Sequence, residues 1–279
     1  MTKGLGRVAP MLLVLTVAPI FVGLMYSVGG ALGILGPGAT GASMTRVTHA
    51  LGSGETWRSL GWTLVVAGVA TLAAMIAAVS AAARLWDSAF GRRLALVPLA
   101  VPHLAAALGV LLLLGQSGLF SRLAFGVGLI AGPSQFPAIV YDRLGVGLAV
   151  SFFWKEFPFL ALTAFAIRAS LPAAWIEAAQ SLGATSRQVH AAVIRPLLVR
   201  GLTPAAISVF AYLFGQYEMA TLLGPSSPPA LAVLTYERIT DPMTEHRGEA
   251  YVLAVLAMLL SFVLVGAYAM TRNRLADDA

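Results

Sequence analysis

Long apolar runs, separated by shorter polar segments, alternate along the whole chain. A bilayer's hydrocarbon core of about 30 Å takes about 20 apolar residues in a helix, and six runs reach that length. The pattern predicts an all-α, polytopic membrane protein with six transmembrane helices. The first run is too long for a secretion signal, whose apolar region has about 7 to 15 residues. The six runs cover approximately Val8 to Val28, Leu60 to Ala82, Leu94 to Gly115, Leu144 to Ile167, Gly201 to Leu223 and Ala250 to Met270.

The segments between the runs differ in character. Gly29 to Trp57 is rich in Gly, Ser and Thr, which is typical of an exposed loop, here with a short surface helix. The third run is entered through Pro98 and Pro102, and the segment between the fifth and sixth runs is expected to be a loop. Arg168 to Arg200 is the most polar internal segment, and it separates the fourth run from the fifth.

Composition agrees with a membrane protein and excludes several other classes. The 279 residues are 58% hydrophobic and 11% charged, with a mean hydropathy of +0.84. The net charge of +6 comes from dispersed basic residues rather than from a basic block, so nothing indicates nucleic-acid binding. The absence of cysteine excludes disulfides, thiolate metal sites and a cysteine nucleophile, and the four histidines are too scattered for a local zinc motif.

The basic residues also predict an orientation. Six spans place both termini on one side, and an excess of Lys and Arg marks the cytoplasmic loops. The side that holds both termini and the Arg168 to Arg200 segment has eleven Lys and Arg, the other side has six, and Lys155 lies within a run. We therefore expect both termini and the Arg168 to Arg200 segment in the cytoplasm. The chain is expected to divide into three parts. Residues 1–57 form the first transmembrane helix and an extracytoplasmic loop, and residues 271–279 form a cytoplasmic tail. Residues 58–270 form the permease core of five transmembrane helices, with a cytoplasmic coupling elbow, a pair of short helices, at 170–196.

The elbow is predicted from local helix signals. Pro172 suits a first helical turn, and Gly183 suits the left-handed residue that follows a helix. Thr185 followed by Gln188 indicates a capping box for a second short helix, which Pro196 is expected to end. Two short helices joined at a glycine would form a rigid knob that a cytoplasmic partner can grip.

The elbow also carries a family signature. EAA, three residues, Gly, nine residues, an aliphatic residue, two residues and Pro resembles the EAA motif of binding-protein-dependent ABC importer permeases, although Arg195 stands where that family usually has leucine. The run FGQYEMATLLGPSSPPALAVLTYE is similar to the spermidine/putrescine, iron, sulfate and phosphonate group, and the resemblance extends from about Trp57 onward. The matching positions are Glu177, Ala178, Ala179, Gly183, Val193 and Pro196.

The resemblance implies a type I ABC importer permease fold and a multi-pass transport subunit of the bacterial cytoplasmic (inner) membrane that is not itself an enzyme. Such a subunit forms the path for a small polar or charged solute that an extracytoplasmic solute-binding protein delivers. It pairs with a second permease, the same or a sister chain, and with ABC ATPase subunits. No Walker A pattern occurs in the sequence, so no cofactor is expected in this chain, and ATP and Mg would be bound by the ATPase. The expected ATPase-coupling residues are Glu177, Ala178, Ala179, Gly183, Ala184, Val193 and Pro196.

Charged residues within the apolar runs mark a candidate translocation path. An unpaired charge at the centre of a membrane costs about 2.5 to 3.5 kcal/mol, so each requires a partner or a function. Lys155 and Glu156 are adjacent and point about 100° apart, so each needs its own partner, and contacts with other helices or water are the simpler interpretation. Glu218 either lines the path or makes a structural bond. The candidate path residues are Trp154, Lys155, Glu156, Gln216, Tyr217 and Glu218.

Other interpretations stay open at this stage. The elbow could be an amphipathic helix at the membrane surface. A proton-coupled secondary transporter would use Glu156 and Glu218 as its relay, and a membrane scaffold would need neither. Asp241, Glu245, His246 and Glu249 suggest a metal site only weakly, and a solvated loop that touches a binding protein fits better. His103 is expected to make a hydrogen bond between helices. The sequence does not identify the transported substrate.

Overall fold

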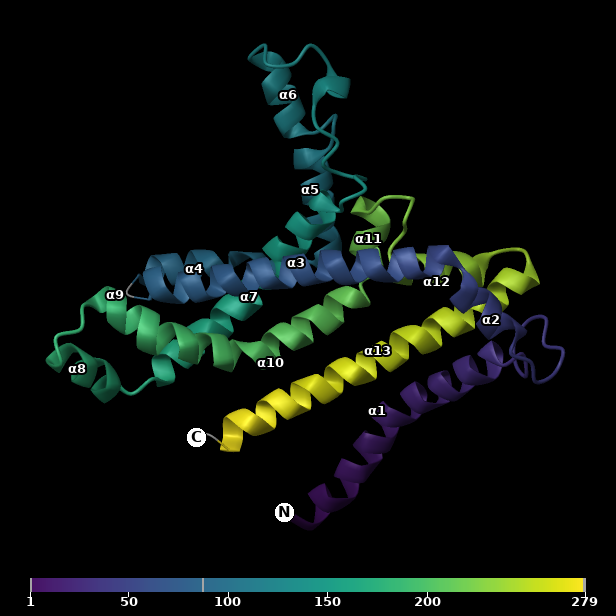
Figure 1. Ribbon diagram of the computed structural model, residues 1–279, viewed down its shortest axis with the longest axis horizontal. Coiled ribbons are helices and arrows are strands. Elements are labelled where there is room, and N and C mark those ends of the chain that lie inside the picture. Colours follow the sequence, from purple (N-terminus) through teal and green to yellow (C-terminus); the bar gives the residue numbers. More distant parts are fainter. Residues whose placement is uncertain (1, 87, 278–279) are drawn as a thin grey trace. The chain divides into compact units, whose positions relative to one another are not determined.

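The computed structural model describes residues 2–86 and 88–277, with side chains for 14–86, 88–244 and 246–273 (Figure 1). Helices are the only regular secondary structure among these residues. The chain divides into two compact units. Unit 1 comprises residues 1–59 and 231–262, and unit 2 comprises residues 60–230 and 263–279. The helices are α1 (Thr2–Ala31), α2 (Thr45–Gly52), α3 (Gly54–Arg84), α4 (Ala89–Leu96), α5 (His103–Leu114), α6 (Leu119–Gly126), α7 (Val146–Ser170), α8 (Ala173–Ser181), α9 (Ser186–Val189), α10 (Arg195–Phe214), α11 (Glu218–Leu223), α12 (Leu231–Thr240) and α13 (Thr244–Asp277).

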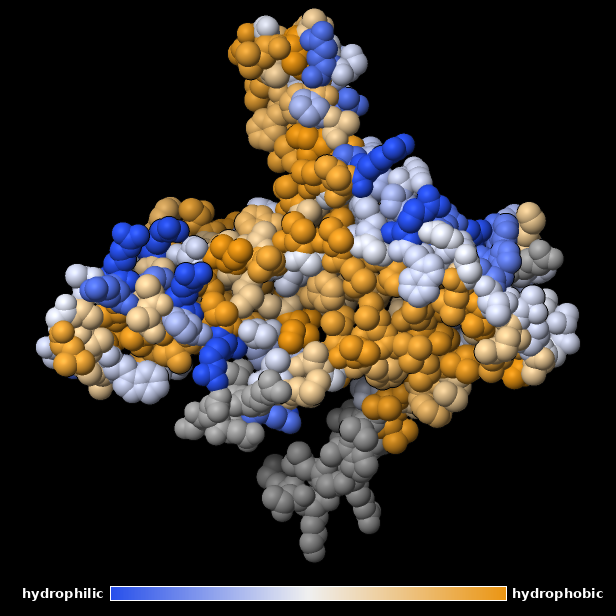
Figure 2. Space-filling view, in the orientation of Figure 1, coloured by the Kyte–Doolittle hydropathy of each residue, from blue (hydrophilic) through white to orange (hydrophobic). Residues whose placement is uncertain are grey.

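Among the described residues, six helical segments are long and apolar enough to cross a membrane, which confirms the number of spans that the sequence predicts. These segments expose large apolar side chains, such as Val65 on α3 and Leu112 on α5, and lipid is their natural solvent. Figure 2 shows apolar residues on the surface of the spanning helices. The segments are Val14–Ala31, Gly54–Arg84, His103–Gly126, Val146–Ser170, Ser186–Phe214 and His246–Asn273.

Helix α7 is the centre of unit 2. It packs against α10 and α5, and also against α4 and α11. Its buried face includes Leu148, Phe152 and Leu160. Helices α7 and α10 approach closely at Gly201, where an added Cβ would lie 2.8 Å from the Ile167 side chain. Pro158 lies inside α7 without ending it, and its ring is buried. The charges of the fourth span therefore stand on a helix that several neighbours hold in place.

Unit 1 is held together by small-residue contacts and by one arginine. Ala31, Ala50 and Val252 form a buried cluster from α1, α2 and α13. The Arg46 guanidinium donates hydrogen bonds to the backbone carbonyls of Gly30, at 2.7 Å, and Gly38, at 2.6 Å. These bonds fix the loop between α1 and α2. Helix α2 confirms the short helix expected within that loop.

Two expectations about the third and outer segments were wrong. The third apolar run is not one helix, because α4 ends at Leu96 and a 3-10 turn, Val97–Ala100, precedes α5. Pro98 and Pro102 lack the N–H that would continue the ladder, and they interrupt the run where they stand. The segment after the fifth run is not only a loop, since α12 occupies Leu231–Thr240.

The fifth span also begins and ends differently from the prediction. Pro196 does not end the second elbow helix, because α9 continues through a π-helical segment, His190–Ile194, into α10. The wider π turn stands immediately before the proline, where a regular helix would clash with the proline ring. At the other end, α10 stops at Phe214 and residues 215–217 separate it from α11. Glu218 is thus the first residue of α11 and not an interior residue of the span.

Candidate functional site

The elbow consists of α8 and α9, joined by a turn that two capping motifs define. The Gly183 N–H donates to the Gln180 carbonyl at 2.9 Å, and the Ala184 N–H donates to the Ala179 carbonyl at 3.1 Å. This pair of bonds is the Schellman motif, and Gly183 takes its left-handed position with φ +87°. The motif explains why a glycine stands at position 183.

A capping box begins α9 immediately after this turn. The Thr185 hydroxyl accepts a bond from the Gln188 N–H, and the Gln188 side chain accepts one from the Thr185 N–H at 2.8 Å. The capping box predicted from the sequence is therefore confirmed. Only Leu182, Gly183 and Ala184 separate the end of α8 from the cap of α9, so the turn has little freedom to bend.

The signature residues occupy distinct places on the elbow. Glu177 and Ala178 are exposed on α8, and Ala179 is partly buried. Within the described part of the chain, the Glu177 carboxylate has no hydrogen-bond or ion-pair partner. Val193 lies in the π segment, partly buried, and Pro196 is exposed at the second position of α10. An exposed carboxylate and a leucine, Leu182, that is 90% exposed leave the tip of the elbow available to another molecule.

The intramembrane charges each have a separate partner, as the sequence predicts. The Lys155 ammonium donates to the Pro98 carbonyl at 3.1 Å, and the Glu156 carboxylate lies 3.2 Å from His103 Nε2. Both partners flank the proline break between α4 and α5. Lys155 and Glu156 are buried, at 6% and 8% exposure, so these bonds lower the cost of charge within the bundle. His103 makes the bond between helices that was expected of it.

One chain of contacts joins two of the candidate path residues. The His103 ring meets the Tyr212 ring edge to face, with centroids 5.4 Å apart, and Gln216 donates to the Tyr212 hydroxyl at 2.6 Å. Glu156 is thereby connected to Gln216 through His103 and Tyr212. Trp154 is 39% exposed, Tyr217 precedes α11, and Glu218 is exposed.

His103 and Tyr212 were not among the candidate path residues, although each carried a signal. His103 is ionisable and follows a proline at the start of a span, and Tyr212 stands four residues before Gln216 on α10, a spacing that places two side chains on one helix face. The pairing of the two rings depends on how α5 and α10 pack, which no local pattern shows.

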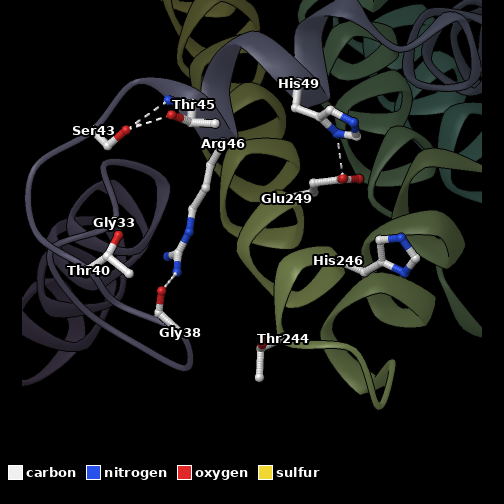
Figure 3. Close-up of a pocket in the computed structure, with 10 residues that line it drawn as sticks. All are labelled: Gly33, Gly38, Thr40, Ser43, Thr45, Arg46, His49, Thr244, His246 and Glu249. Atoms are coloured by element: carbon white, nitrogen blue, oxygen red, sulfur yellow. Dashed lines mark hydrogen bonds and ion pairs between the residues drawn. The ribbon is translucent and has the colours of Figure 1, made fainter.

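A polar cavity of about 560 Å³ lies within unit 1 (Figure 3). His49 bonds Glu249 across it at 2.7 Å, and Arg238 contacts both Glu249 and Glu55. The network links α2, α3, α12 and α13. The cavity is lined by Gly33, Gly38, Thr40, Ser43, Thr45, Arg46, His49, Thr244, His246 and Glu249.

The acidic residues near this cavity make separate pairs. Asp241 Oδ2 lies 2.9 Å from His246 Nδ1, whereas Glu249 pairs with His49. The hydrogen bond with His246, and a second one from the Met243 N–H, lower the pKa of Asp241. This interaction is present above the ordinary pKa of aspartate and is lost as the pH falls through the lowered value. No group of three metal-ligating side chains occurs among the described residues, and the Glu245 side chain lies outside them.

Comparisons with known proteins identify the class. Residues 74–276 match the family described as the binding-protein-dependent transport system inner membrane component. In sequence, 207 residues are 28% identical to the inner membrane ABC transporter permease protein YnjC of Escherichia coli strain K12, covering 71% of this chain and 38% of that one. Over 229 residues, the chain is also 26% identical to the maltose/maltodextrin transport system permease protein MalF of Vibrio vulnificus, covering 76% of this chain and 43% of that one.

The fold is shared with solved ABC transporter structures. A bacterial alginate ABC transporter, crystallised with an alginate-pentasaccharide-bound periplasmic protein, contains a chain that matches with a TM-score of 0.68 and 16% identity, over 96% of this chain and 93% of that one. A second structure of an alginate importer matches with a TM-score of 0.66.

The chain is therefore a multi-pass membrane protein with the fold of ABC importer permeases. It belongs to the family of binding-protein-dependent transport system inner membrane components, and it spans about two fifths of the length of the curated relatives that it matches.

Proposed function

We propose that this chain is the permease subunit of an ATP-driven importer, coupled to separate ATPase subunits through the elbow. The supporting observation is mechanical. The capping motifs make the turn between α8 and α9 rigid, and α9 continues without a break into the fifth span. A displacement of the elbow by a partner would therefore be transmitted along one helix, from Ser186 to Phe214.

The exposed surface of the elbow suits a protein partner in the cytoplasm. The Glu177 carboxylate has no partner among the described residues, and Leu182 offers an exposed apolar side chain. This combination is suited to a groove with basic or amide groups at its rim. ATP and Mg would be bound by the ATPase subunits. Closure of those subunits would tilt the spans between inward-open and outward-open states.

The cargo is proposed only as a small polar or charged solute that an extracytoplasmic binding protein delivers. The relatives named for maltose and alginate transport concern saccharides, at identities of 28% or less. The chain of Glu156, His103, Tyr212 and Gln216 offers both hydrogen-bonding groups and aromatic faces for a polar solute. Nothing in the comparisons supports the proton-coupled alternative.

Co-purification with candidate ATPase subunits tests the coupling proposal. Glu177→Arg reverses the exposed charge, and Gly183→Pro cannot adopt the φ of +87° that the turn requires. We expect each variant to reach the membrane but to retain less than about a tenth of the ATPase, since a truncated or clashing contact at the centre of an interface costs 2 kcal/mol or more. Glu237→Arg, an exposed glutamate on α12, is the matched control and should retain the ATPase. Undiminished assembly and transport in both elbow variants would contradict the proposal.

A further inference from the structure

Two arginines and a tryptophan meet at one end of unit 2, on a surface that the coupling proposal does not use. The guanidinium carbon of Arg168 lies 5.3 Å from the centroid of the Trp86 ring, and that of Arg92 lies 5.6 Å from it. Arg92 also donates a hydrogen bond to the Trp86 carbonyl. Arg168 stands in the last turn of α7, and Trp86 follows the end of α3, so two spans end at this cluster.

The short helix beside the cluster has one apolar and one basic side. Phe90, Leu94 and Val97 are spaced four and three residues apart, which places them on one face, and they are 76%, 59% and 56% exposed. Arg92 points about 160° away from that face, and Ala95 is buried. A helix of this kind, directly after a span, is suited to lie in the membrane surface with its apolar side among the acyl chains.

The beginning of this helix is fixed in position. The Ser88 hydroxyl accepts a hydrogen bond from the Gly91 N–H at 3.0 Å, which is an N-cap bond. A Cβ added at Gly91 would lie 3.0 Å from the Leu85 side chain, so the first turn packs on the residue that follows α3. The apolar side and the arginines are thus held in a defined relation to the end of the span.

The local charge is positive. From Arg84 to Arg93 the sequence contains three arginines and one aspartate, Asp87, which lies outside the described residues, and Arg168 adds a further charge. Within the described ranges, no carboxylate forms an ion pair with any of these arginines. Stacking on the tryptophan leaves the edge of a guanidinium free to donate hydrogen bonds to an anion. Figure 2 shows hydrophilic side chains gathered at this end, where α4 and α9 lie.

We propose that Arg92, Arg168 and Trp86 form a binding site for the headgroup of an anionic phospholipid at the membrane surface, with the opposite face of α4, Phe90, Leu94 and Val97, set among the acyl chains. The two guanidinium groups supply charge and hydrogen bonds to the phosphate, the indole ring lies at the depth of the headgroups where tryptophan is favoured, and the apolar face supplies the lipid contact. Both parts of the lipid are needed, which distinguishes this site from one for a free phosphate.

The test is a titration of the detergent-purified full chain with fluorescently labelled phosphatidylglycerol and phosphatidylcholine. We expect the anionic lipid to bind more tightly to the native chain. The Arg92→Gln, Arg168→Gln double variant should weaken its binding about 25-fold, at about 5-fold for each charge near the surface. Arg92→Lys, Arg168→Lys keeps the charge and should retain most of the affinity. Arg122→Gln, Arg143→Gln removes two exposed arginines elsewhere in unit 2 and should bind as the native chain does.

Two further measurements complete the experiment. Phe90→Ser removes apolar contact only and should weaken both lipids, while glycerol phosphate at millimolar concentration should not displace the labelled lipid. Equal affinity for the two lipids, unchanged affinity in the double glutamine variant, or displacement by glycerol phosphate alone would each overturn the proposal. Elution as a single species in size-exclusion chromatography, with native helix content, shows that each variant is folded.

Discussion

Arg238 is the residue on which the charge network of unit 1 depends. It contacts Glu249, whose side chain is 10% exposed, and Glu55, whose side chain is 40% exposed. Arg238→Leu should lower the free energy of unfolding by about 2 kcal/mol, because Glu249 would lose one of two partners while still buried. Thermal unfolding in detergent measures the change. Arg122→Leu, which removes an exposed arginine bonded to the Ser117 carbonyl, should cost less than about 0.5 kcal/mol, and equal losses would contradict the network's role.

The pair of His103 and Glu156 gives a second prediction at this scale. His103→Leu should destabilise the chain by about 2 to 3 kcal/mol, because the buried carboxylate of Glu156 would lose its bond. His103→Leu combined with Glu156→Leu should recover most of that loss, since two apolar groups need no partner. A double-mutant cycle of unfolding free energies measures the coupling. His190→Leu is the control, and additive single effects at positions 103 and 156 would show that the pair contributes nothing.

Partners of single residues were only partly predictable. Adjacency on one helix was enough to show that Lys155 and Glu156 need separate partners, because the angle between them follows from helix geometry. The identity of those partners, the Pro98 carbonyl and His103, depends on the packing of α7 against the break before α5. The pairing of His49 with Glu249 joins residues 200 positions apart and has no local signal.

At the scale of elements, Gly183 and Gly145 both have positive φ but differ in the space around them. Replacing each by alanine therefore distinguishes the cost of the left-handed backbone from the cost of a steric clash. Gly183, at φ +87°, has no heavy atom within 4 Å of an added Cβ, whereas a Cβ at Gly145, at φ +73°, would lie 2.7 Å from the Trp62 ring. Gly183→Ala should therefore cost about 1 kcal/mol, for the left-handed conformation alone. Gly145→Ala should cost about 1 to 3 kcal/mol more, because the ring must also move. Unfolding followed by circular dichroism measures both, and a larger loss at Gly183 would contradict the assignment.

Helix ends were predictable where a local bond makes them and not elsewhere. The capping box at Thr185 and the left-handed Gly183 follow from side chains within four residues, so the turn between α8 and α9 lies where the sequence predicts it. The end at Pro196 was wrong because a π segment accommodates the proline, and no simple residue pattern signals that segment. The break at 215–217 was missed because Gly215, Gln216 and Tyr217 contain no proline and stand inside a longer apolar run.

At the scale of the whole molecule, the orientation of the chain in the membrane is the prediction to test, because the number of spans does not determine it. Moving loops rich in arginine across the membrane is disfavoured, and eleven basic residues lie on the side of the elbow against six on the other. The chain contains no cysteine, so a single introduced cysteine can be labelled without background. Leu182→Cys, at the tip of the elbow, and Thr40→Cys, in the loop between α1 and α2, are both exposed positions on opposite predicted sides.

The expected labelling follows from that placement. A membrane-impermeant maleimide added to spheroplasts should label Thr40→Cys and leave Leu182→Cys unmodified, and inverted vesicles should give the opposite result. Both variants should fold, since neither substitution removes a hydrogen bond or a buried contact among the described residues, and size-exclusion chromatography in detergent checks this. Labelling of Leu182→Cys in intact spheroplasts would place the elbow outside the cell, beyond the reach of an ATPase. The rigid connection between α9 and the fifth span could then not transmit movement from an ATPase, even though the fold is that of ABC importer permeases.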